Sequence, residues 1–174
     1  MLKKIKLDYD LFNLVKADYD QHSGSCIGHM QHELADVYDQ YGGFPKSYTI
    51  KNTLIHQLWW DNTQLDFVDI GRQLNMEIVT ISTICQQPGN IIPWHRDTFY
   101  QINQRHPNRT ETKIRANIYL EDWKMGHFIQ YNDQVDTHWQ AGQGFIWDNS
   151  ILHLGANAGI ENKYTMQVSG FALK

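Results

Sequence analysis

The chain has 174 residues, of which 41% are hydrophobic and 20% charged, as is usual for one globular domain with a buried core. Its net charge of −4 gives no general attraction to phosphate backbones, and its apolar runs are too short to span a membrane, so we expect neither a nucleic-acid nor a membrane partner. The start lacks the apolar segment of a signal peptide, and Cys26 and Cys85 are too few for a disulfide framework, so we expect a reduced, cytoplasmic protein, with oligomeric state left open.

Two helical patterns occupy the first part of the chain. Residues 28–41 repeat apolar side chains every three or four positions, which predicts a short helix. Residues 62–75 predict a second helix, capped by Asp61 or Asn62, with Leu65, Val68 and Leu74 on its buried side. The segment between the two helices, residues 48–60, fits a strand and a turn.

From residue 76 onward, short β-branched runs alternate with Gly, Asn and Asp turns. This spacing indicates a mainly β sandwich or small barrel, with the earlier helices covering one outer face of a single domain. The polar stretch 101–112 lacks an apolar pattern and reads as a lid or binding loop. The predicted strands are residues 77–85, 91–98, 113–120, 127–131, 144–147, 152–156 and 164–172.

His95 and Asp97 form the sharpest local feature. On a strand they would share one face, because alternate side chains point the same way. With a distant third ligand they would complete the two-histidine, one-carboxylate triad of non-haem iron sites, and His153 can supply it. Taken alone, a His-x-Asp pair is equally typical of a surface histidine beside a solvated carboxylate.

Two further groups could line a ligand cavity. Lys163 and Thr165 would share one face of the last strand, where a cation and a hydroxyl can receive a carboxylate. Arg115 and Asn117 would share one face of residues 113–120, opposite apolar neighbours. A solvated lysine and a solvent-facing edge strand are the alternative interpretations of these two patterns.

These residues occur in an order that resembles the aspartyl/asparaginyl β-hydroxylase-like branch of the Fe(II)/2-oxoglutarate oxygenases, over roughly residues 81–171. Pro88-Gly89 precedes His95 as the family's turn precedes its first iron ligand, and Arg115-Ala116-Asn117 is similar to its Arg-x-His segment. The matching stretch before the second histidine is Trp139-Gln140-Ala141-Gly142, followed by Phe145-Ile146-Trp147-Asp148-Asn149-Ser150. Lys163 stands ten residues after His153, where the family has an arginine, and Asn117 replaces the family's histidine.

The resemblance implies a double-stranded β-helix, a cupin-like jelly roll, with residues 76–174 as its core and residues 1–75 as a helix-containing flank. It also implies Fe(II) on His95, Asp97 and His153, and 2-oxoglutarate held by Lys163, Thr165, Arg115 and Asn117. Dioxygen and 2-oxoglutarate would then be consumed to hydroxylate a C–H bond of a peptide, protein side chain or amino-acid-like substrate. The sequence leaves open whether Lys163 or Arg115 holds the carboxylate of 2-oxoglutarate that lies farther from the metal.

Other interpretations of the sequence also remain open. The site could belong to a cupin-type metalloenzyme that does not use 2-oxoglutarate, or to a non-catalytic jelly-roll binding module. The basic residues Arg105, His106 and Arg109 could favour an acidic substrate at the mouth, and Trp59, Trp60, Trp94 and Trp123 could line its entrance. A second metal group is conceivable at His22, Cys26, His29 and His32, although their spacing matches no standard zinc motif.

Overall fold

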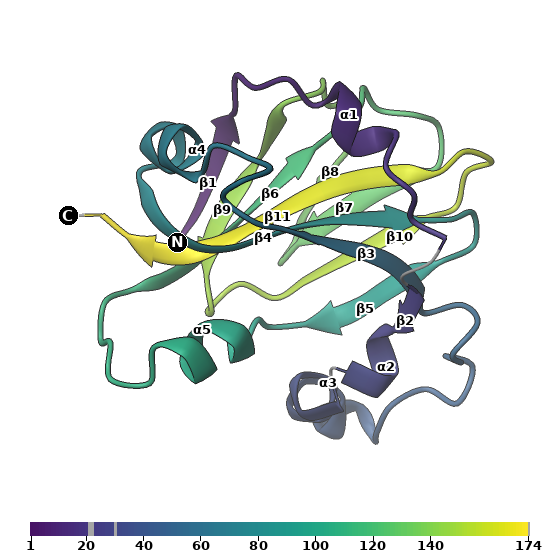
Figure 1. Cartoon of the computed structure of the whole chain (residues 1–174). Helices are drawn as coiled ribbons and strands as arrows, with labels where there is room; N and C mark the ends of the chain where they lie inside the picture. Colours follow the sequence, from purple (N-terminus) through teal and green to yellow (C-terminus); the bar gives the residue numbers. More distant parts are fainter. Residues whose placement is uncertain (21–22, 30, 174) are drawn as a thin grey trace.

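A computed structural model describes residues 1–20, 23–29 and 31–173, which form two antiparallel sheets with helices at their outer sides (Figure 1). The larger sheet has the strand order β1-β9-β6-β11-β4-β3-β2, and the smaller has the order β5-β10-β7-β8. The larger sheet comprises β1 (Leu2–Lys6), β9 (Gln143–Asp148), β6 (Lys113–Tyr119), β11 (Lys163–Ala172), β4 (Met76–Gln86), β3 (Leu54–Trp60) and β2 (Ser23–Ser25). The smaller comprises β5 (Ile91–His95), β10 (His153–Asn157), β7 (His127–Tyr131) and β8 (Gln134–Asp136).

The strands from β4 to β11 pass back and forth between the two sheets. β9, β6, β11 and β4 form the middle of the larger sheet, and β5, β10, β7 and β8 form the smaller one opposite. Side chains of both sheets meet in one cluster, in which Tyr119 and Phe145 contact Ile129 and Tyr131. This interleaved order confirms the predicted double-stranded β-helix.

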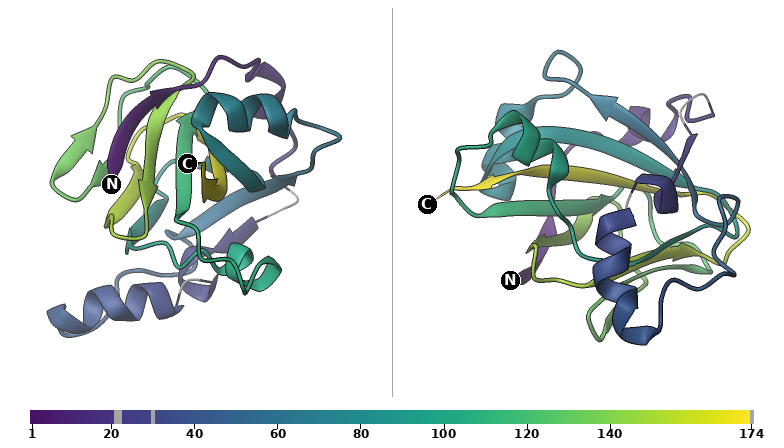
Figure 2. Two further views of the ribbon diagram at one scale, coloured as in Figure 1. Left: turned by 90° about the vertical axis from the view of Figure 1, so that its left-hand side faces the viewer. Right: turned by 90° about the horizontal axis from the view of Figure 1, so that it is seen from below.

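Strand alternation divides the larger sheet into two chemically different faces. Ile81, Ile118, Met166 and Val168 are buried on the outer face, where α1 (Phe12–Val15) and α4 (Phe67–Leu74) cover them. The inner face carries Arg115, Asn117 and Tyr119 on β6 and Lys163 and Thr165 on β11. Polar groups therefore collect between the sheets, while the aliphatic core lies under the helices. Figure 2 shows α4 lying across the outer side of the larger sheet.

The helix predicted at residues 62–75 is shorter than expected. It begins at Phe67, because Asp66 caps it by accepting from the amides of Val68 and Asp69 at 3.1 and 2.9 Å. Asn75 ends it in the left-handed conformation. The prediction that Val68 is buried is wrong: its side chain is 83% exposed, and Ile70 faces the core instead.

The other flanking elements also refine the predictions. The described residues of the predicted helix 28–41 are helical, as α2 (Cys26–His29), α3 (Gln31–Tyr38) and the 3-10 helix η1 (Asp39–Tyr41). α3 packs beside β5, on the opposite side of the larger sheet from α4 (Figure 1). The stretch 101–112 is not wholly a loop, because α5 (Tyr100–Arg105) forms where Ile102 packs against Phe99 and Phe171.

The first part of the chain contributes to the larger sheet as well as to the helices. β1 pairs with β9, and β3 pairs with β4. Cys26 and Cys85 are both buried and free. Among the described residues, no helix has the length and apolar character needed to cross a membrane.

Candidate metal centre

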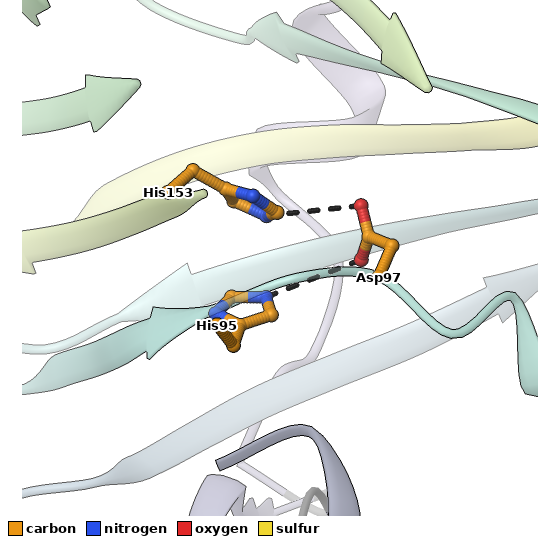
Figure 3. A group of neighbouring side chains, drawn as sticks. All are labelled: His95, Asp97 and His153. Carbon is orange, nitrogen blue, oxygen red and sulfur yellow. Dashed lines mark ion pairs between the residues drawn. The ribbon is translucent and has the colours of Figure 1, made fainter. Parts of the chain in front are cut away.

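The three predicted metal ligands converge between the sheets. His95 ends β5 and His153 begins β10, and the two residues are paired across these strands with ring centroids 4.2 Å apart. Asp97 faces both rings, with Oδ1 4.0 Å from His95 Nε2 and Oδ2 3.8 Å from His153 Nε2 (Figure 3). One ligand atom from each residue lies within 4.8 Å of the others, and all three residues are buried.

Asp97 does not lie on the same strand as His95, contrary to the prediction. β5 stops at His95, so alternation along a strand does not carry Asp97 to the same face as His95. Asp97 lies in the loop after the strand, where Arg115 Nη1 donates to its Oδ1 and Trp147 Nε1 donates to its Oδ2 at 2.8 Å. These two donors hold the carboxylate against the histidines.

Backbone carbonyls fix the orientation of both imidazoles. His95 Nδ1 lies 2.8 Å from the carbonyl oxygen of Pro93, and His153 Nδ1 lies 3.2 Å from that of Ile151. A carbonyl only accepts, so each Nδ1 carries a proton and each Nε2 is the ring atom that faces Asp97. Burial lowers the pKa of His153 to about 3, which keeps this imidazole neutral.

These residues fit a divalent transition metal. His153 Nε2 is buried and has no hydrogen-bond partner among the described residues, which is costly unless another group occupies that lone pair. Burial raises the pKa of Asp97, but the Arg115 guanidinium, the two histidines and the hydrogen bond from Trp147 together outweigh it, and the pKa lies below its ordinary value. Two neutral imidazoles and one ionised carboxylate are the donor set of non-haem Fe(II) sites.

Arg115 is anchored on a second side. Its Nε donates to Ser169 Oγ at 3.0 Å, and its guanidinium lies 5.6 Å from the Phe99 ring centroid. The sequence resemblance assigned Arg115 to the metal-bound end of 2-oxoglutarate. In the structure its carboxylate partner is Asp97.

Lys163 lies deeper in the interior, on the opposite sheet from the histidines. Its side chain is 2% exposed, and its ammonium donates to the backbone carbonyls of Phe128 and Ala156 at 3.1 and 3.2 Å. No carboxylate of the described residues pairs with it, and burial lowers its pKa to about 7. Lys163 is therefore a buried amine whose hydrogen-bond partners among the described residues are neutral carbonyls.

Gly155 lets the Lys163 ammonium lie close against the backbone of β10. A Cβ added at Gly155 would lie 3.3 Å from Lys163 Nζ and 3.4 Å from Gln86 Oε1. Gly155 stands two residues after His153 and thus on the same face of β10. The backbone between the metal ligand and the lysine is therefore free of a side chain.

Thr165 and Asn117 line the same interior. Thr165 pairs with Tyr119 across β11 and β6, and Asn117 pairs with Gln167 one step closer to Arg115. The hydroxyl of Tyr131 lies within reach of Asn117 and Tyr119 but makes no hydrogen bond of normal geometry among the described residues. Burial raises the pKa of Tyr131, so its hydroxyl keeps its proton.

A cavity of about 550 Å³ opens beside the triad. His95 and Arg115 line its inner end, and Trp59 and Tyr100, which are 54% and 65% exposed, line it nearer the surface. Much of the remaining wall carries uncharged polar side chains. These are Gln57, Thr80, Ser82, Thr98, Gln101, Gln167 and Ser169.

The basic residues predicted near the mouth have different surroundings. Arg109 is bound by Glu77 and Glu111, with its closest contact, to Glu77 Oε1, at 2.6 Å. His106 lies edge-on to Phe171. Arg105 donates to the carbonyl of Val79 and lines a second cavity that shares Trp59 and Thr80 with the first.

Of the four tryptophans predicted at the entrance, Trp59 lines the cavity beside the triad. Trp60 lines the second cavity and packs against the aliphatic core, Trp123 packs inside the barrel, and Trp94 packs against α3. The second conceivable metal group cannot be evaluated, since His22 and the side chains of His29 and His32 lie outside the described residues.

Trp147, Ser169 and Gly155 were missed as site residues by sequence reasoning. Trp147 lay inside the stretch from Phe145 to Ser150 that supported the family resemblance, which was the only signal for it. Ser169 has a sequence signal as well, because it continues the alternation of Lys163 and Thr165 toward Arg115.

The sequence matches no family model and no curated protein. Among solved structures, the viral collagen prolyl hydroxylase of Paramecium bursaria Chlorella virus-1, solved as a 2OG complex, is 10% identical with a TM-score of 0.54, covering 99% of this chain and 96% of that one. A prolyl-4-hydroxylase of Pseudomonas putida is 14% identical with a TM-score of 0.50, covering 87% of this chain and 91% of that one. At these identities the similarity shows the fold. Neither neighbour is an aspartyl/asparaginyl hydroxylase, so that branch rests on the sequence motifs alone.

Proposed function

We propose that this protein is an Fe(II)- and 2-oxoglutarate-dependent dioxygenase that hydroxylates a C–H bond of a peptide, a protein side chain or an amino-acid-like compound. The observation that carries the proposal is the buried ammonium of Lys163, which has only neutral partners and faces the side chain-free backbone of Gly155. The triad alone would suit several metalloenzymes. An uncompensated charge is costly to bury, so Lys163, which lies farther inside the barrel than the triad, favours an anionic ligand that extends inward from the metal.

Spacing supports a short dicarboxylate as that ligand. Two residues along a strand advance by about 6.7 Å, so Gly155 lies that far beyond His153. A five-carbon dicarboxylate can reach from the metal position past Gly155 to Lys163. Thr165, on the same face of β11, offers a hydroxyl to the same carboxylate.

Each residue has a distinct task in this proposal. His95, Asp97 and His153 hold Fe(II), which with 2-oxoglutarate and dioxygen supplies the oxidant for hydroxylation. Lys163 and Thr165 bind the distal carboxylate, and that negative charge raises the pKa of Lys163 and keeps it protonated. Arg115 and Trp147 orient Asp97, and Arg115 and Asn117 face the metal-bound end of the cosubstrate.

The cavity beside His95 is the proposed substrate site. Its amide and hydroxyl lining suits the neutral polar groups of a peptide or an amino-acid-like compound. Thr98 helps to shape this wall, because its amide and hydroxyl both donate to Glu33 of α3 at 2.8 and 2.5 Å. A target C–H bond placed there would lie beside the candidate ligand His95.

Two alternatives predict different behaviour. A cupin-type metalloenzyme without 2-oxoglutarate would bind iron but would not need the Lys163 ammonium. A non-catalytic jelly-roll module would bind neither iron nor 2-oxoglutarate. The lone pair of His153 Nε2, without a partner among the described residues, favours a metal-binding protein over the second alternative.

The test is anaerobic addition of Fe(II) and then 2-oxoglutarate, with detection of the visible charge-transfer band of the chelate. We expect the band in the wild type and succinate formation once oxygen is admitted. His95→Ala should lose iron binding, whereas Lys163→Met should bind iron normally but need much more 2-oxoglutarate. Iron binding with neither band nor succinate would support the cupin alternative, and equal iron affinity in His95→Ala would refute the triad.

A further inference from the structure

A row of aromatic side chains runs from the metal site through the barrel to the surface. Trp147 donates to the candidate ligand Asp97 at 2.8 Å, and its ring centroid lies 4.8 Å from that of His153. Tyr131 follows at 5.2 Å from Trp147. The row therefore begins in direct contact with two of the three candidate metal ligands.

The row continues away from the metal. The hydroxyls of Tyr131 and Tyr119 lie within reach of each other, and Tyr119 stacks on Trp139 with ring centroids 3.9 Å apart and planes at 14°. Trp123 packs against the same cluster, and its amide donates to the carbonyl of Trp139 at 2.9 Å. Trp123 in turn stacks at 4.1 Å on His138, which is exposed.

Of the two tyrosines in the row, Tyr119 is the one whose hydroxyl has a carboxylate acceptor among the described residues. Its hydroxyl donates to Asp136 Oδ2 at 2.5 Å, and both residues are buried. Burial raises the pKa of Tyr119, so the phenol does not ionise by itself. Loss of an electron makes a phenol strongly acidic, and the proton can then move along the existing hydrogen bond to the carboxylate.

We propose that Trp147, Tyr131, Tyr119, Trp139 and Trp123 form an electron relay, which protects the metal site when an oxidant forms there without a substrate. Tyr119 is the residue on which the radical rests, and Asp136 accepts its proton. The inference depends on the proposed function for the source of the oxidant. Its benefit is that the oxidant is quenched before it attacks His95, His153 or other residues around the metal.

The electrons and protons balance in two steps. In the first, the oxidant gains one electron through Trp147 and Tyr131, while the O–H bond of Tyr119 breaks, its electron entering the relay and its proton passing to Asp136. In the second, a thiol or ascorbate-type reductant at Trp123 gives one electron back through Trp139, and Asp136 returns the proton to Tyr119. Each cycle thus consumes one electron from the reductant and restores the relay.

The test loads the protein with Fe(II), omits 2-oxoglutarate, adds limiting hydrogen peroxide and freezes the sample for electron paramagnetic resonance. We expect a tyrosyl signal that narrows when ring-deuterated tyrosine is incorporated. The signal should vanish in Tyr119→Phe, fall in Asp136→Asn, and persist in Tyr41→Phe, a control at an exposed tyrosine outside the relay. Ascorbate should shorten the signal's lifetime less in Trp139→Phe than in the wild type.

Peptide mapping by mass spectrometry gives a second readout, which does not depend on activity. Oxygen addition should be found at Trp139 and Trp123 in the wild type, and shift to Trp147 and Tyr131 in Tyr119→Phe. An unchanged signal in Tyr119→Phe, or equal oxidation in His95→Ala, would overturn the relay.

The proposed function and the relay can fail separately. A Tyr119 radical in a protein that binds iron but never turns over 2-oxoglutarate would overturn the proposed function and leave the relay standing. Full 2-oxoglutarate turnover with no Tyr119 radical would overturn the relay alone. If the wild type binds no iron at the triad, both are overturned.

Discussion

Replacing Lys163 by methionine should make the ligand-free protein more stable near neutral pH. Burial moves the pKa of this lysine from 10.5 to about 7. At about 1.4 kcal/mol for each tenfold change, keeping the ammonium charged in the folded state costs about 5 kcal/mol. Methionine has a similar length and removes that cost, but it also removes two hydrogen bonds to carbonyls, together worth about 2 kcal/mol. The net gain is about 3 kcal/mol at pH 7.

The pH dependence gives the stricter test. Because the pKa of Lys163 is lower in the folded than in the unfolded state, the unfolded chain binds more protons between pH 7 and 10.5. The wild type should therefore gain stability as the pH rises through this window, and Lys163→Met should lack that part of the rise. The advantage of the variant is full below pH 7 and shrinks as the pH rises. Near pH 10.5 the variant should be the less stable protein by about 2 kcal/mol, the contribution of the two lost hydrogen bonds.

Urea unfolding of both proteins at several pH values measures the effect, with Lys51→Met as a control at an exposed lysine. Addition of 2-oxoglutarate at a hundred times its dissociation constant should stabilise the wild type by about 2.7 kcal/mol and Lys163→Met much less. Parallel pH curves for the wild type and Lys163→Met would refute the claim that this ammonium is buried without a carboxylate partner.

Three further substitutions separate the metal from the cosubstrate. Gly155→Val should lower 2-oxoglutarate affinity by about tenfold or more, since its side chain presses on Lys163 Nζ, while Fe(II) affinity stays unchanged; calorimetry would contradict this if both fell together. Trp147→Phe removes a donor to Asp97 and should weaken Fe(II) binding by about tenfold in a chelator competition, whereas unchanged affinity would mean that Trp147 only packs. Arg115→Met leaves the buried Asp97 carboxylate unpaired and should cost about 3 kcal/mol in urea unfolding. Zn(II) should restore part of that stability, and a loss that zinc does not reduce would contradict the argument.

Local sequence patterns predicted the jelly-roll core well, because β-branched runs and turn residues alternate regularly after residue 76. They missed β1 and β8, which have little alternation of their own and are held by neighbours distant in sequence or by a tight turn. The helix at residues 62–75 was overextended for a related reason. The cap was expected at Asp61 or Asn62, and the fold uses Asp66 instead.

The candidate ligands were predictable from residue type, but the residues that position them were not. His95, Asp97 and His153 come from segments that the fold brings together, and the sequence named all three. The partners of Asp97 and the space at Gly155 depend on which side chains face each other across the sheets. Arg115 illustrates this limit: its residue type suggested an anion as partner, and the fold gives it the carboxylate of Asp97.

The two histidines belong to the smaller sheet, whereas Lys163 and Thr165 belong to the larger. A small molecule bound to the metal at one end and to Lys163 at the other would therefore connect the two sheets, which otherwise touch through side chains. Metal alone should slow amide hydrogen exchange mainly around β5 and β10, while metal with cosubstrate should also slow it in β11 and β4. Binding of metal and cosubstrate between the sheets would in this way reduce local opening of both sheets, including the larger sheet on whose outer face α4 packs.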